Sequence, residues 1–317
     1  MFKFIIGNFM LGDSSAYYSN KEKENDPKMA NLHNEFLAFE QNISVSRSRT
    51  TKLRTSRQAL ERRIVEHFRL KYGVTIPKFY IQGSYKMKTM ILDSSSTYDV
   101  DLGIYFSEKP SVEAATLQKW VIEAVRRHTV DGVQHKDKCV RVVYRRDFHI
   151  DLPVYYQTSN DRNPYLATKN GGWMESDPKE LCDWFSNNKD ANGQLIRLVK
   201  YFKAWAKNRS RKMPSGIALT VLATKNYRAN DRDDVAFYET AKAVLNSFPS
   251  NFLGTKKITC VNPAAPGDDL LDRLNSDQKD RFYNALKELV HDGGQAINNS
   301  DTSTASNLWR KQLGNKF

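Results

Sequence analysis

Cysteine is scarce in this chain of 317 residues, and long apolar runs are absent. Cys139, Cys182 and Cys260 lie far apart and form no C-x-x-C pair. This spacing argues against a disulfide framework or a structural zinc site and suits a reducing, cytoplasmic compartment. No apolar run approaches the ~20 residues of a membrane-spanning helix, so no membrane association is expected. With no internal repeat or low-complexity segment either, the chain is typical of a globular protein with one large or two ordinary domains.

Acidic residues are outnumbered, since 49 Lys and Arg against 36 Asp and Glu give a formal net charge of +13. A basic excess favours polyanionic partners such as nucleotides, nucleic acid or an anionic membrane, without choosing among them. Between residues 31 and 71, apolar residues recur every three, four or seven positions and predict one long helix, or two joined near 44–48. Gly73 is expected to end it. Its solvent face is basic, formed by Arg47, Arg49, Lys52, Arg54, Arg57, Arg62, Arg63 and Arg69.

Two carboxylates stand one residue apart in the apolar run 98–106, shortly after Gln82-Gly83-Ser84. On a strand, side chains at positions i and i+2 share a face, so Asp99 and Asp101 project together. Adjacent like charges are costly unless a cation lies between them, and Mg²⁺ prefers carboxylate and phosphate oxygens. Gly83 lets the backbone approach a phosphate, and Ser84 adds a hydrogen-bond donor. The alternative is a solvated pair of aspartates on an exposed sheet face.

A third carboxylate, Asp151, follows on a later strand, on the same face as His149. In a two-metal site the ions clamp the attacking and the leaving oxygen and usually share a third carboxylate. The hypothesis is that Asp99 and Asp101 hold both ions and that Asp151 holds the one that activates an attacking hydroxyl. The alternatives are that Asp151 pairs with Arg145 or Arg146 and that His149 is a packed side chain rather than a ligand.

The order of predicted elements changes near residue 160. Before it, helices alternate with strands at 78–82, 98–106, 139–144 and 148–156, the last two forming a hairpin, and a helix capped by Ser111 runs to about residue 128. After it, the pattern is almost wholly helical, with an ordered loop at 262–267. We expect a tail and linker at 1–30, an α/β core with a long basic N-terminal helix at 31–160, and a helical lobe at 161–317 with a cleft between them. The candidate helices of the second half are 180–185, 194–208, 215–227, 233–247, 276–291 and 302–313.

These motifs resemble the nucleotidyltransferase pattern of the DNA polymerase β superfamily, with Gly83-Ser84 followed by Asp99-Val100-Asp101 and a later Asp151. The long N-terminal helix, the α/β core and the helical second half resemble the cGAS/DncV-like nucleotidyltransferases (CD-NTases) of bacterial CBASS anti-phage signalling. The chain lacks the His/Cys zinc insertion of the animal sensor members, so DNA-gated activation by that route is not expected. Further segments that match are 195–205, 214–219, 261–270 and 309–314.

The resemblance implies an α+β fold with a bilobal polymerase β-like core and a C-terminal helical lobe. It implies stepwise joining of NTPs, with ATP and GTP as the expected substrates, into a cyclic di- or trinucleotide and release of pyrophosphate. A purine-containing, cGAMP-like cyclic dinucleotide is the favoured product, and two Mg²⁺ or Mn²⁺ ions are the implied cofactors. Regulatory protein partners from a defence operon are also implied.

The family's functional residues fall on particular positions of this sequence. Its acidic triad falls on Asp99, Asp101 and Asp151, as catalytic residues and metal ligands. Its triphosphate-gripping lysine and serine fall on Lys200 and Ser215, which join the Gln82-Gly83-Ser84 motif as nucleotide-binding residues. Without the resemblance, Lys200 is an ordinary surface lysine and Ser215 a plain helix N-cap.

Two other functions remain open. A template-independent RNA nucleotidyltransferase of the poly(A) or CCA-adding type shares the acidic triad, and the basic helix would then hold its primer. A catalytically inactive protein that binds nucleic acid through the basic helix is the third possibility, which the intact carboxylates disfavour. Strict primer dependence would identify the second function, and salt-sensitive duplex binding without NTP turnover would identify the third.

Overall fold

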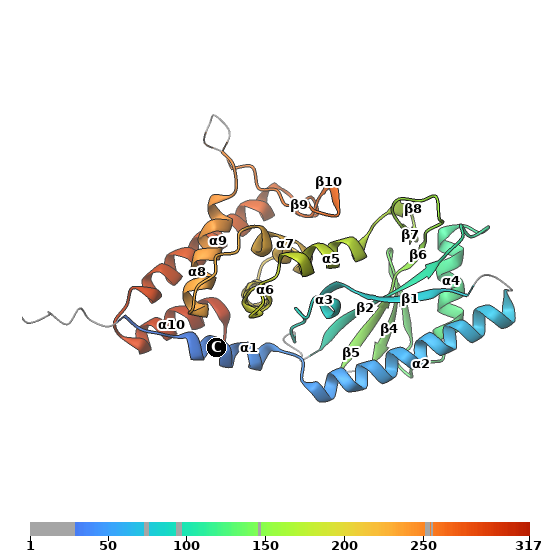
Figure 1. Cartoon of the computed structure of the whole chain (residues 1–317), viewed down its shortest axis with the longest axis horizontal. Coiled ribbons are helices and arrows are strands. Elements are labelled where there is room, and N and C mark those ends of the chain that lie inside the picture. The colour runs from blue at the N-terminus through green and yellow to red at the C-terminus, as the bar shows by residue number, and fades with distance from the viewer. Residues whose placement is uncertain (1–28, 73–75, 93–96, 145–146, 251–253, 255) are drawn as a thin grey trace, which may run out of the picture.

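The computed structural model describes residues 29–72, 76–92, 97–144, 147–250, 254 and 256–317. The expected N-terminal tail, its linker, and Gly73 as the end of the first helical segment lie outside these residues. Figure 1 shows two lobes, one built around a β-sheet and the other from helices. In the described part of the chain, no helix combines the length and apolar character needed to cross a membrane.

An eight-stranded sheet forms the first lobe, with β2 (Tyr98–Phe106) at its centre. β2 pairs antiparallel with β1 (Lys78–Gln82) and parallel with β5 (Phe148–Leu152) and β6 (Val154–Tyr156). The predicted hairpin is present, since β4 (Val140–Tyr144) pairs antiparallel with β5. The remaining strands are β3 (Val133–His135), β7 (Tyr165–Thr168) and β8 (Gly172–Glu175).

The sequence does not predict β7 and β8, and the expectation of an almost wholly helical chain after residue 160 is wrong for this segment. β7 pairs with β6 and β8 pairs with β7, so the sheet continues to Glu175. Each of these strands has only four residues, too few for an alternating pattern to emerge. The helix α4 (Ala114–Val125) has Glu113 rather than Ser111 at its N-cap position.

Two helices cover one face of the sheet, namely α2 (Arg47–Lys71) and α4. Alternate residues of β2, Val100, Leu102 and Ile104, are buried against apolar side chains of these helices such as Ile64 and Val121. Strand periodicity then directs Asp99 and Asp101 to the opposite face. The helices therefore leave the carboxylate face free for the second lobe.

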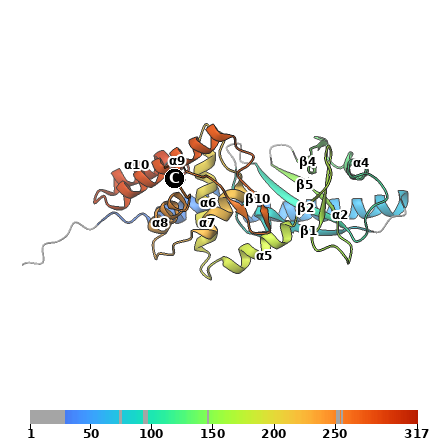
Figure 2. The ribbon, with the colours of Figure 1, turned by 90° about the horizontal axis from the view of Figure 1, so that it is seen from above.

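The second lobe is a bundle of helices with its own hydrophobic core, and the six helices expected in it are all present. α5 (Pro178–Asn188) crosses from the sheet to the bundle (Figures 1 and 2). The expected loop at 262–267 is instead a short hairpin of β9 (Val261–Asn262) and β10 (Ala265–Asp269). The six helices are α5 (Pro178–Asn188), α6 (Gln194–Lys207), α7 (Gly216–Lys225), α8 (Asp233–Asn246), α9 (Ser276–Ile297) and α10 (Thr302–Leu313).

The first helix, α1 (His33–Ile43), belongs to this helical core rather than to the sheet lobe. The Phe36 ring lies 5.1 Å from the rings of both Tyr201 on α6 and Trp309 on α10. The residues 44–46 separate α1 from α2, at the place where the sequence allows a break. The segment expected as part of the α/β core is therefore divided between the two lobes.

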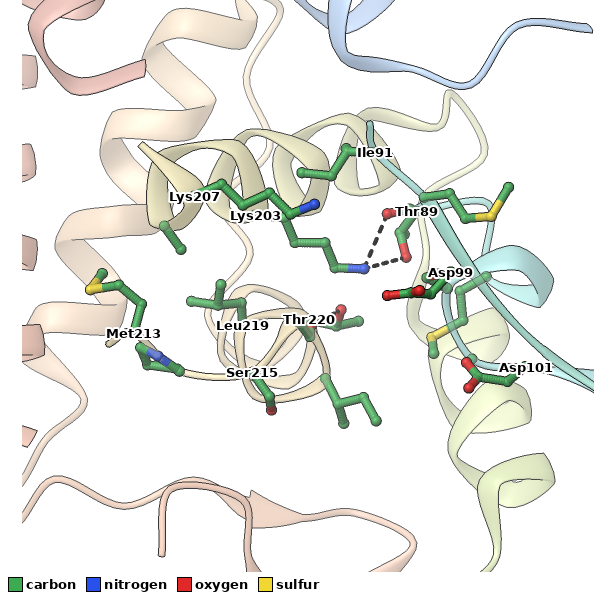
Figure 3. A pocket seen from close by; sticks show the side chains of 18 of the residues that line it. Thr89, Ile91, Asp99, Asp101, Lys203, Lys207, Met213, Ser215, Leu219 and Thr220 are labelled. Carbon is green, nitrogen blue, oxygen red and sulfur yellow. Dashed lines mark hydrogen bonds between the residues drawn. The ribbon is translucent and has the colours of Figure 1, made fainter. Parts of the chain in front are cut away.

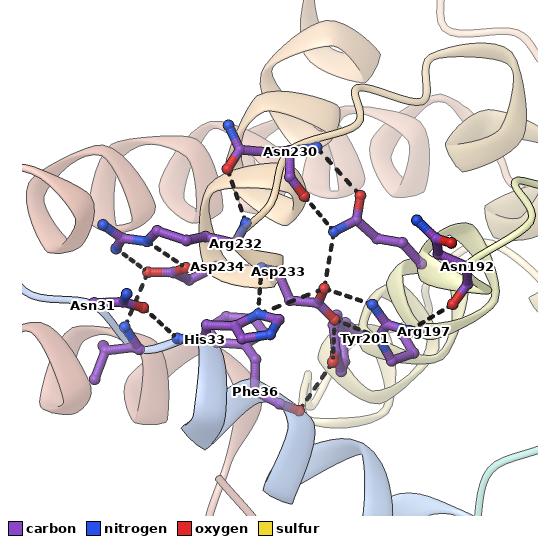
Figure 4. Close-up of polar contacts among 12 residues, drawn as sticks. Asn31, His33, Phe36, Asn192, Arg197, Tyr201, Asn230, Arg232, Asp233 and Asp234 are labelled. Atoms are coloured by element: carbon purple, nitrogen blue, oxygen red, sulfur yellow. Dashed lines mark hydrogen bonds and ion pairs between the residues drawn. The ribbon is translucent and has the colours of Figure 1, made fainter.

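Buried carboxylates at the start of α8 fix α1 to the bundle (Figure 4). Asp233 accepts hydrogen bonds from Arg197 Nε at 2.6 Å and from Gln194 Nε2 at 2.9 Å. Burial raises the pKa of Asp233, but the hydrogen bonds from Arg197 and Gln194 leave it below its ordinary value. Asp234 accepts a hydrogen bond of 3.3 Å from the backbone of Leu32. These two aspartates thus hold the entry to α1 in place.

Candidate active site

A tight turn joins β1 to the short helix α3 (Gly83–Lys86). Gly83 has φ 64°, a left-handed conformation that favours glycine. A Cβ atom at Gly83 would lie 2.2 Å from Asp101 Oδ2, so only glycine lets the Asp101 carboxylate lie against this turn. Ser84 follows and lines the cavity described below. The Gly-Ser turn and the Asp99–Asp101 strand therefore form one surface.

The strand register brings the three predicted carboxylates to neighbouring positions. Asp101 of β2 is the Cα partner of Asp151 of β5, and Asp99 is the partner of His149. Burial, followed by the negative charges of Asp151 and Asp99, raises the pKa of Asp101 from 3.8 to about 7. Positive charge placed nearby would therefore stabilise the ionised form of Asp101.

Arg141 of β4 supplies part of that charge. Its Nε and Nη2 donate hydrogen bonds of 2.7 and 2.8 Å to the two oxygens of Asp151, and Nη2 lies 3.5 Å from Asp99 Oδ1. His149 Nδ1 lies 3.0 Å from the same Asp99 oxygen. Among the described residues, no group of three or more His, Cys, Asp or Glu side chains is arranged to hold a metal ion. The carboxylates are adjacent, but in this structure Asp99 and Asp151 are bound by the basic side chains of Arg141 and His149.

A cavity of about 470 Å³ lies between the lobes and contains much of the predicted site (Figure 3). The sheet lobe contributes Asp99, Asp101, Gly83 and Ser84 to its lining. The wall also has a strong apolar component, with the side chains of Met87, Met90, Ile91, Met213, Ile217 and Leu219. The cavity thus combines carboxylates, cations and apolar surface, the three features that a metal-bound nucleotide requires.

Lys200 does not lie in this cavity. Its ammonium group contacts the Glu40 carboxylate and donates a 3.0 Å hydrogen bond to Ser44 Oγ, both on the α1 side of the helix. Lys203, one turn later on α6, lines the cavity instead. In this structure Lys203, and not the predicted Lys200, therefore faces the cavity.

Lys203 is held in a buried position that faces the carboxylates (Figure 3). Its Nζ donates hydrogen bonds to Thr89 Oγ1 at 2.8 Å and to the Thr89 carbonyl at 3.1 Å. Burial, followed by the charges of Lys207 and Lys200, lowers the pKa of Lys203 from 10.5 to about 7. A Cβ atom at Gly216 would lie 3.3 Å from Lys203 Cε, so this glycine leaves room for the lysine side chain.

Ser215 lies in the cavity wall at the N-cap of α7, where its Oγ accepts a 3.2 Å hydrogen bond from the Ala218 amide. The serine is therefore both a helix cap and a cavity residue. Lys207 and Arg211 also line the cavity, and no predicted motif includes them. Lys207 follows Lys200 and Lys203 at helical spacing on α6, which is the sequence signal for it, whereas Arg211 lies beyond the end of this helix.

Gln82 does not line the cavity. Its buried side chain donates a 3.1 Å hydrogen bond to the Tyr155 hydroxyl and accepts one of 3.2 Å from the Tyr105 hydroxyl. These two tyrosine rings stack at 4.5 Å between centroids. The side chain of Gln82 thus supports the end of β1 and lies outside the cavity that Gly83 and Ser84 line.

The cavity thus brings the Gly83-Ser84 turn and two carboxylates of β2 together with basic side chains of the helical lobe. Residues 77–155 match the family described as "Cyclic GMP-AMP synthase DncV-like, nucleotidyltransferase domain". Over these residues the chain is similar to the DncV-like nucleotidyltransferases. The matched region contains Gly83, the three carboxylates and Arg141, so the similarity lies in the same part of the chain as the candidate site.

Two curated relatives have related activities in their names. The chain is 30% identical over 194 residues to a cyclic GMP-AMP synthase of Escherichia albertii, a match that covers 56% of this chain and 43% of that protein. It is 26% identical over 259 residues to a cyclic AMP-AMP-AMP synthase of an Acinetobacter species, covering 75% and 72%. The match with the first relative therefore spans less than half of that relative's length.

Solved structures of Vibrio cholerae DncV share the fold. The cyclic AMP-GMP synthase structure superposes with a TM-score of 0.75 at 17% identity, over 90% of this chain and 97% of that chain. The GTP-bound form gives a TM-score of 0.76, over 90% and 96%. The predicted α+β fold, with a polymerase β-like core and a helical lobe, is confirmed.

Proposed function

We propose that this chain is a metal-dependent nucleotidyltransferase that joins NTPs into a cyclic di- or trinucleotide with release of pyrophosphate. ATP and GTP are the proposed substrates, and a purine-containing cyclic dinucleotide that acts in anti-phage signalling is the favoured product. The cavity between the lobes carries the proposal, because carboxylates of β2 lie opposite the buried Lys203 of α6. The names of the two curated relatives support the reaction class.

The residues present fit divalent metal ions. Asp99, Asp101 and Asp151 offer the oxygen ligands that Mg²⁺ and Mn²⁺ prefer, and burial beside two other carboxylates, which raises the pKa of Asp101, is a setting that a bound cation would stabilise. Two such ions, when bound, would neutralise phosphate charge and favour ionisation of the attacking hydroxyl. The arrangement requires the Asp151 carboxylate to leave Arg141, which holds it in this structure.

The side chains of the helical lobe are placed to orient a triphosphate. The Lys203 ammonium can exchange its hydrogen bonds to Thr89 for phosphate oxygens without leaving the cavity. Ser215 and Ser84 offer hydroxyl donors from opposite walls. In each step the ribose hydroxyl oxygen forms a bond to an α-phosphorus, the bond to the pyrophosphate oxygen breaks, and the hydroxyl proton passes to a carboxylate or to solvent. Holding both partners in line is the main contribution of the protein.

The apolar wall of the cavity suits the flat faces of a nucleobase. Three methionines, Met87, Met90 and Met213, are part of it. Methionine side chains adapt to different shapes and make favourable contacts with aromatic rings. This wall is therefore compatible with the use of more than one base. Because NTPs are cytoplasmic substrates, we also propose that the reaction takes place in the cytoplasm.

The test is incubation of the protein with Mg²⁺ and all four NTPs in the absence of nucleic acid. Mass spectrometry and nuclease mapping should reveal a cyclic product, and chelation of the metal should abolish it. The Asp99→Asn and Asp151→Asn variants, with folding verified by circular dichroism, serve as inactive controls. Elongation that strictly needs an RNA primer would contradict the proposal and favour the template-independent polymerase. Duplex binding without any NTP turnover would favour a catalytically inactive nucleic-acid-binding protein.

A further inference from the structure

Arg141 lies on β4, directly beside Asp151, a proposed metal ligand on the neighbouring strand β5. The register of β4 and β5 makes Arg141 the Cα partner of Asp151, so their side chains emerge on the same face. The guanidinium binds both Asp151 oxygens at 2.7 and 2.8 Å and also lies 3.5 Å from Asp99. Both members of the pair are mostly shielded from solvent, with side chains 23% and 13% exposed. A shielded, bidentate pair of this kind is among the stronger ion pairs in proteins.

Asp151 and Asp99 therefore already have a counter-ion, the Arg141 guanidinium, without any metal ion. Arg141 engages Asp151 and Asp99, and His149 engages Asp99 from the other side. This arrangement explains why the described residues form no metal-binding group although three carboxylates stand at neighbouring positions. A metal ion and the guanidinium require the same oxygens of Asp151, so the two compete.

We propose that Arg141 is a counter-ion latch, a positioning residue that keeps Asp151 and Asp99 from binding free metal until a nucleotide is present. The proposal rests on the proposed function, in which these carboxylates hold divalent ions. An incoming triphosphate offers the guanidinium a replacement anion, to which planar arginine binds well. Release of Asp151 then becomes favourable only when metal and nucleotide arrive together. By linkage, the metal and the nucleotide must each increase the affinity of the protein for the other.

The latch predicts that metal binding to the nucleotide-free protein tightens when Arg141 is removed. Binding of Mn²⁺ is measured by electron paramagnetic resonance titration, without nucleotide, on the wild type and on Arg141→Gln. Because a bidentate charge-assisted pair is lost and one positive charge no longer repels the ion, affinity should rise by about tenfold or more. Arg141→Lys keeps the positive charge but cannot bind both Asp151 oxygens as a guanidinium does. Its affinity for Mn²⁺ should therefore lie between those of the wild type and Arg141→Gln.

Matched controls separate the latch from general charge effects and from failure of the metal site. Arg54→Gln removes the same charge from an exposed position on α2, on the other side of the sheet, and should leave Mn²⁺ affinity unchanged. Asp151→Asn, added to Arg141→Gln, should reverse the tightening. If the tighter binding of Arg141→Gln survives Asp151→Asn, the ion is not bound at Asp151 and the proposed metal site fails. If Arg141→Gln, with an unchanged circular dichroism spectrum, does not tighten binding, while Asp151→Asn weakens Mn²⁺ binding in the presence of a nonhydrolysable ATP analogue, only the latch is overturned. Should Arg141→Gln unfold, Arg141→Lys decides by the same criterion.

Discussion

Lys200 and Lys203 lie one turn apart on α6, and their ammonium groups have different neighbours. Lys200 meets Glu40 and Ser44, and Lys203 meets Thr89 inside the cavity. We expect Lys203→Met to lower kcat/KM for NTPs by about 10–100-fold, because a hydrogen bond between a charged lysine and phosphate is lost. Steady-state kinetics with pyrophosphate release as the readout measures this effect.

Lys200→Met is the matched control on the same helix. It removes the contact with the α1 helix, so we expect a lower melting temperature with kcat/KM within a few-fold of the wild type. An equal loss of kcat/KM in the two variants, with Lys200→Met still folded, would show that the cavity lining does not identify the phosphate-binding lysine.

The sequence could not distinguish these lysines for a physical reason. Leu195, Leu198, Val199 and Phe202 are all buried, so α6 is apolar over much of its circumference and its pattern does not reveal which side faces the cleft. The direction of Lys203 depends on Gly216 of another helix, which leaves space beside it. Similarly, the counter-ion of Asp151 is Arg141 because of strand register, whereas the sequence-based alternatives, Arg145 and Arg146, lie outside the described residues. Both outcomes depend on tertiary contacts.

Asp101 provides a prediction about pH. Its pKa is raised to about 7 in the folded protein, chiefly by burial, so ionising it opposes folding. The free-energy cost to folding is absent below the pKa of Asp101 in the unfolded chain, near 3.8. It grows as the pH rises and is complete above about 7. In metal-free buffer, Asp101→Asn should therefore melt above the wild type at pH 8, by roughly 2–4 °C for each 1 kcal/mol removed.

The difference in melting temperature between Asp101→Asn and the wild type should shrink at pH 5, where the wild-type Asp101 carboxyl is largely protonated in the folded protein. Differential scanning fluorimetry in EDTA at both pH values tests this. Lys203, whose pKa is lowered to about 7, is present in both proteins and does not by itself create the difference. A variant that melts lower than the wild type at pH 8 would contradict the assigned cost of this carboxylate.

At the scale of elements, long periodic segments were predictable and short ones were not. α10 has the predicted bounds, and α2 and β2 follow clear periods of 3.6 and 2. The four-residue strands β7 and β8 were missed because their formation depends on pairing with β6, not on local pattern. The break between α1 and α2 was allowed by the sequence, but the assignment of α1 to the helical lobe follows from the contacts of Phe36.

The basic face of α2 lies on the other side of the sheet from the proposed catalytic carboxylates. α2 covers the sheet face that carries Val100 and Leu102, whereas Asp99 and Asp101 point to the other face. We expect the double variant Arg47→Glu/Arg54→Glu, at two exposed positions, to keep NTP turnover in the absence of nucleic acid. Any salt-sensitive duplex binding should weaken in a fluorescence anisotropy titration. Loss of nucleic-acid-independent turnover in the folded variant would favour a primer-binding role for this helix.

At the scale of the whole molecule, the two lobes have separate hydrophobic cores, and the cavity lies between them. Described polar contacts across the boundary include Lys203 with Thr89 and the 2.8 Å hydrogen bond from the Leu92 amide to the Ile43 carbonyl. Each core is large enough to unfold as a cooperative unit. A ligand that touches both walls of the cavity would therefore act as a bridge.

We accordingly expect the ligand-free protein to unfold in two calorimetric transitions. A nonhydrolysable ATP analogue with Mg²⁺ should raise the first transition and bring the two together, because ligand at 100 times Kd contributes about 2.7 kcal/mol to the state that binds it. Lys203→Met should reduce the shift, since its helical lobe loses a contact with the phosphates, whereas Lys200→Met should retain it. A single transition without ligand, or a shift that is equal in wild type and Lys203→Met, would mean that nucleotide does not couple the lobes through this side chain.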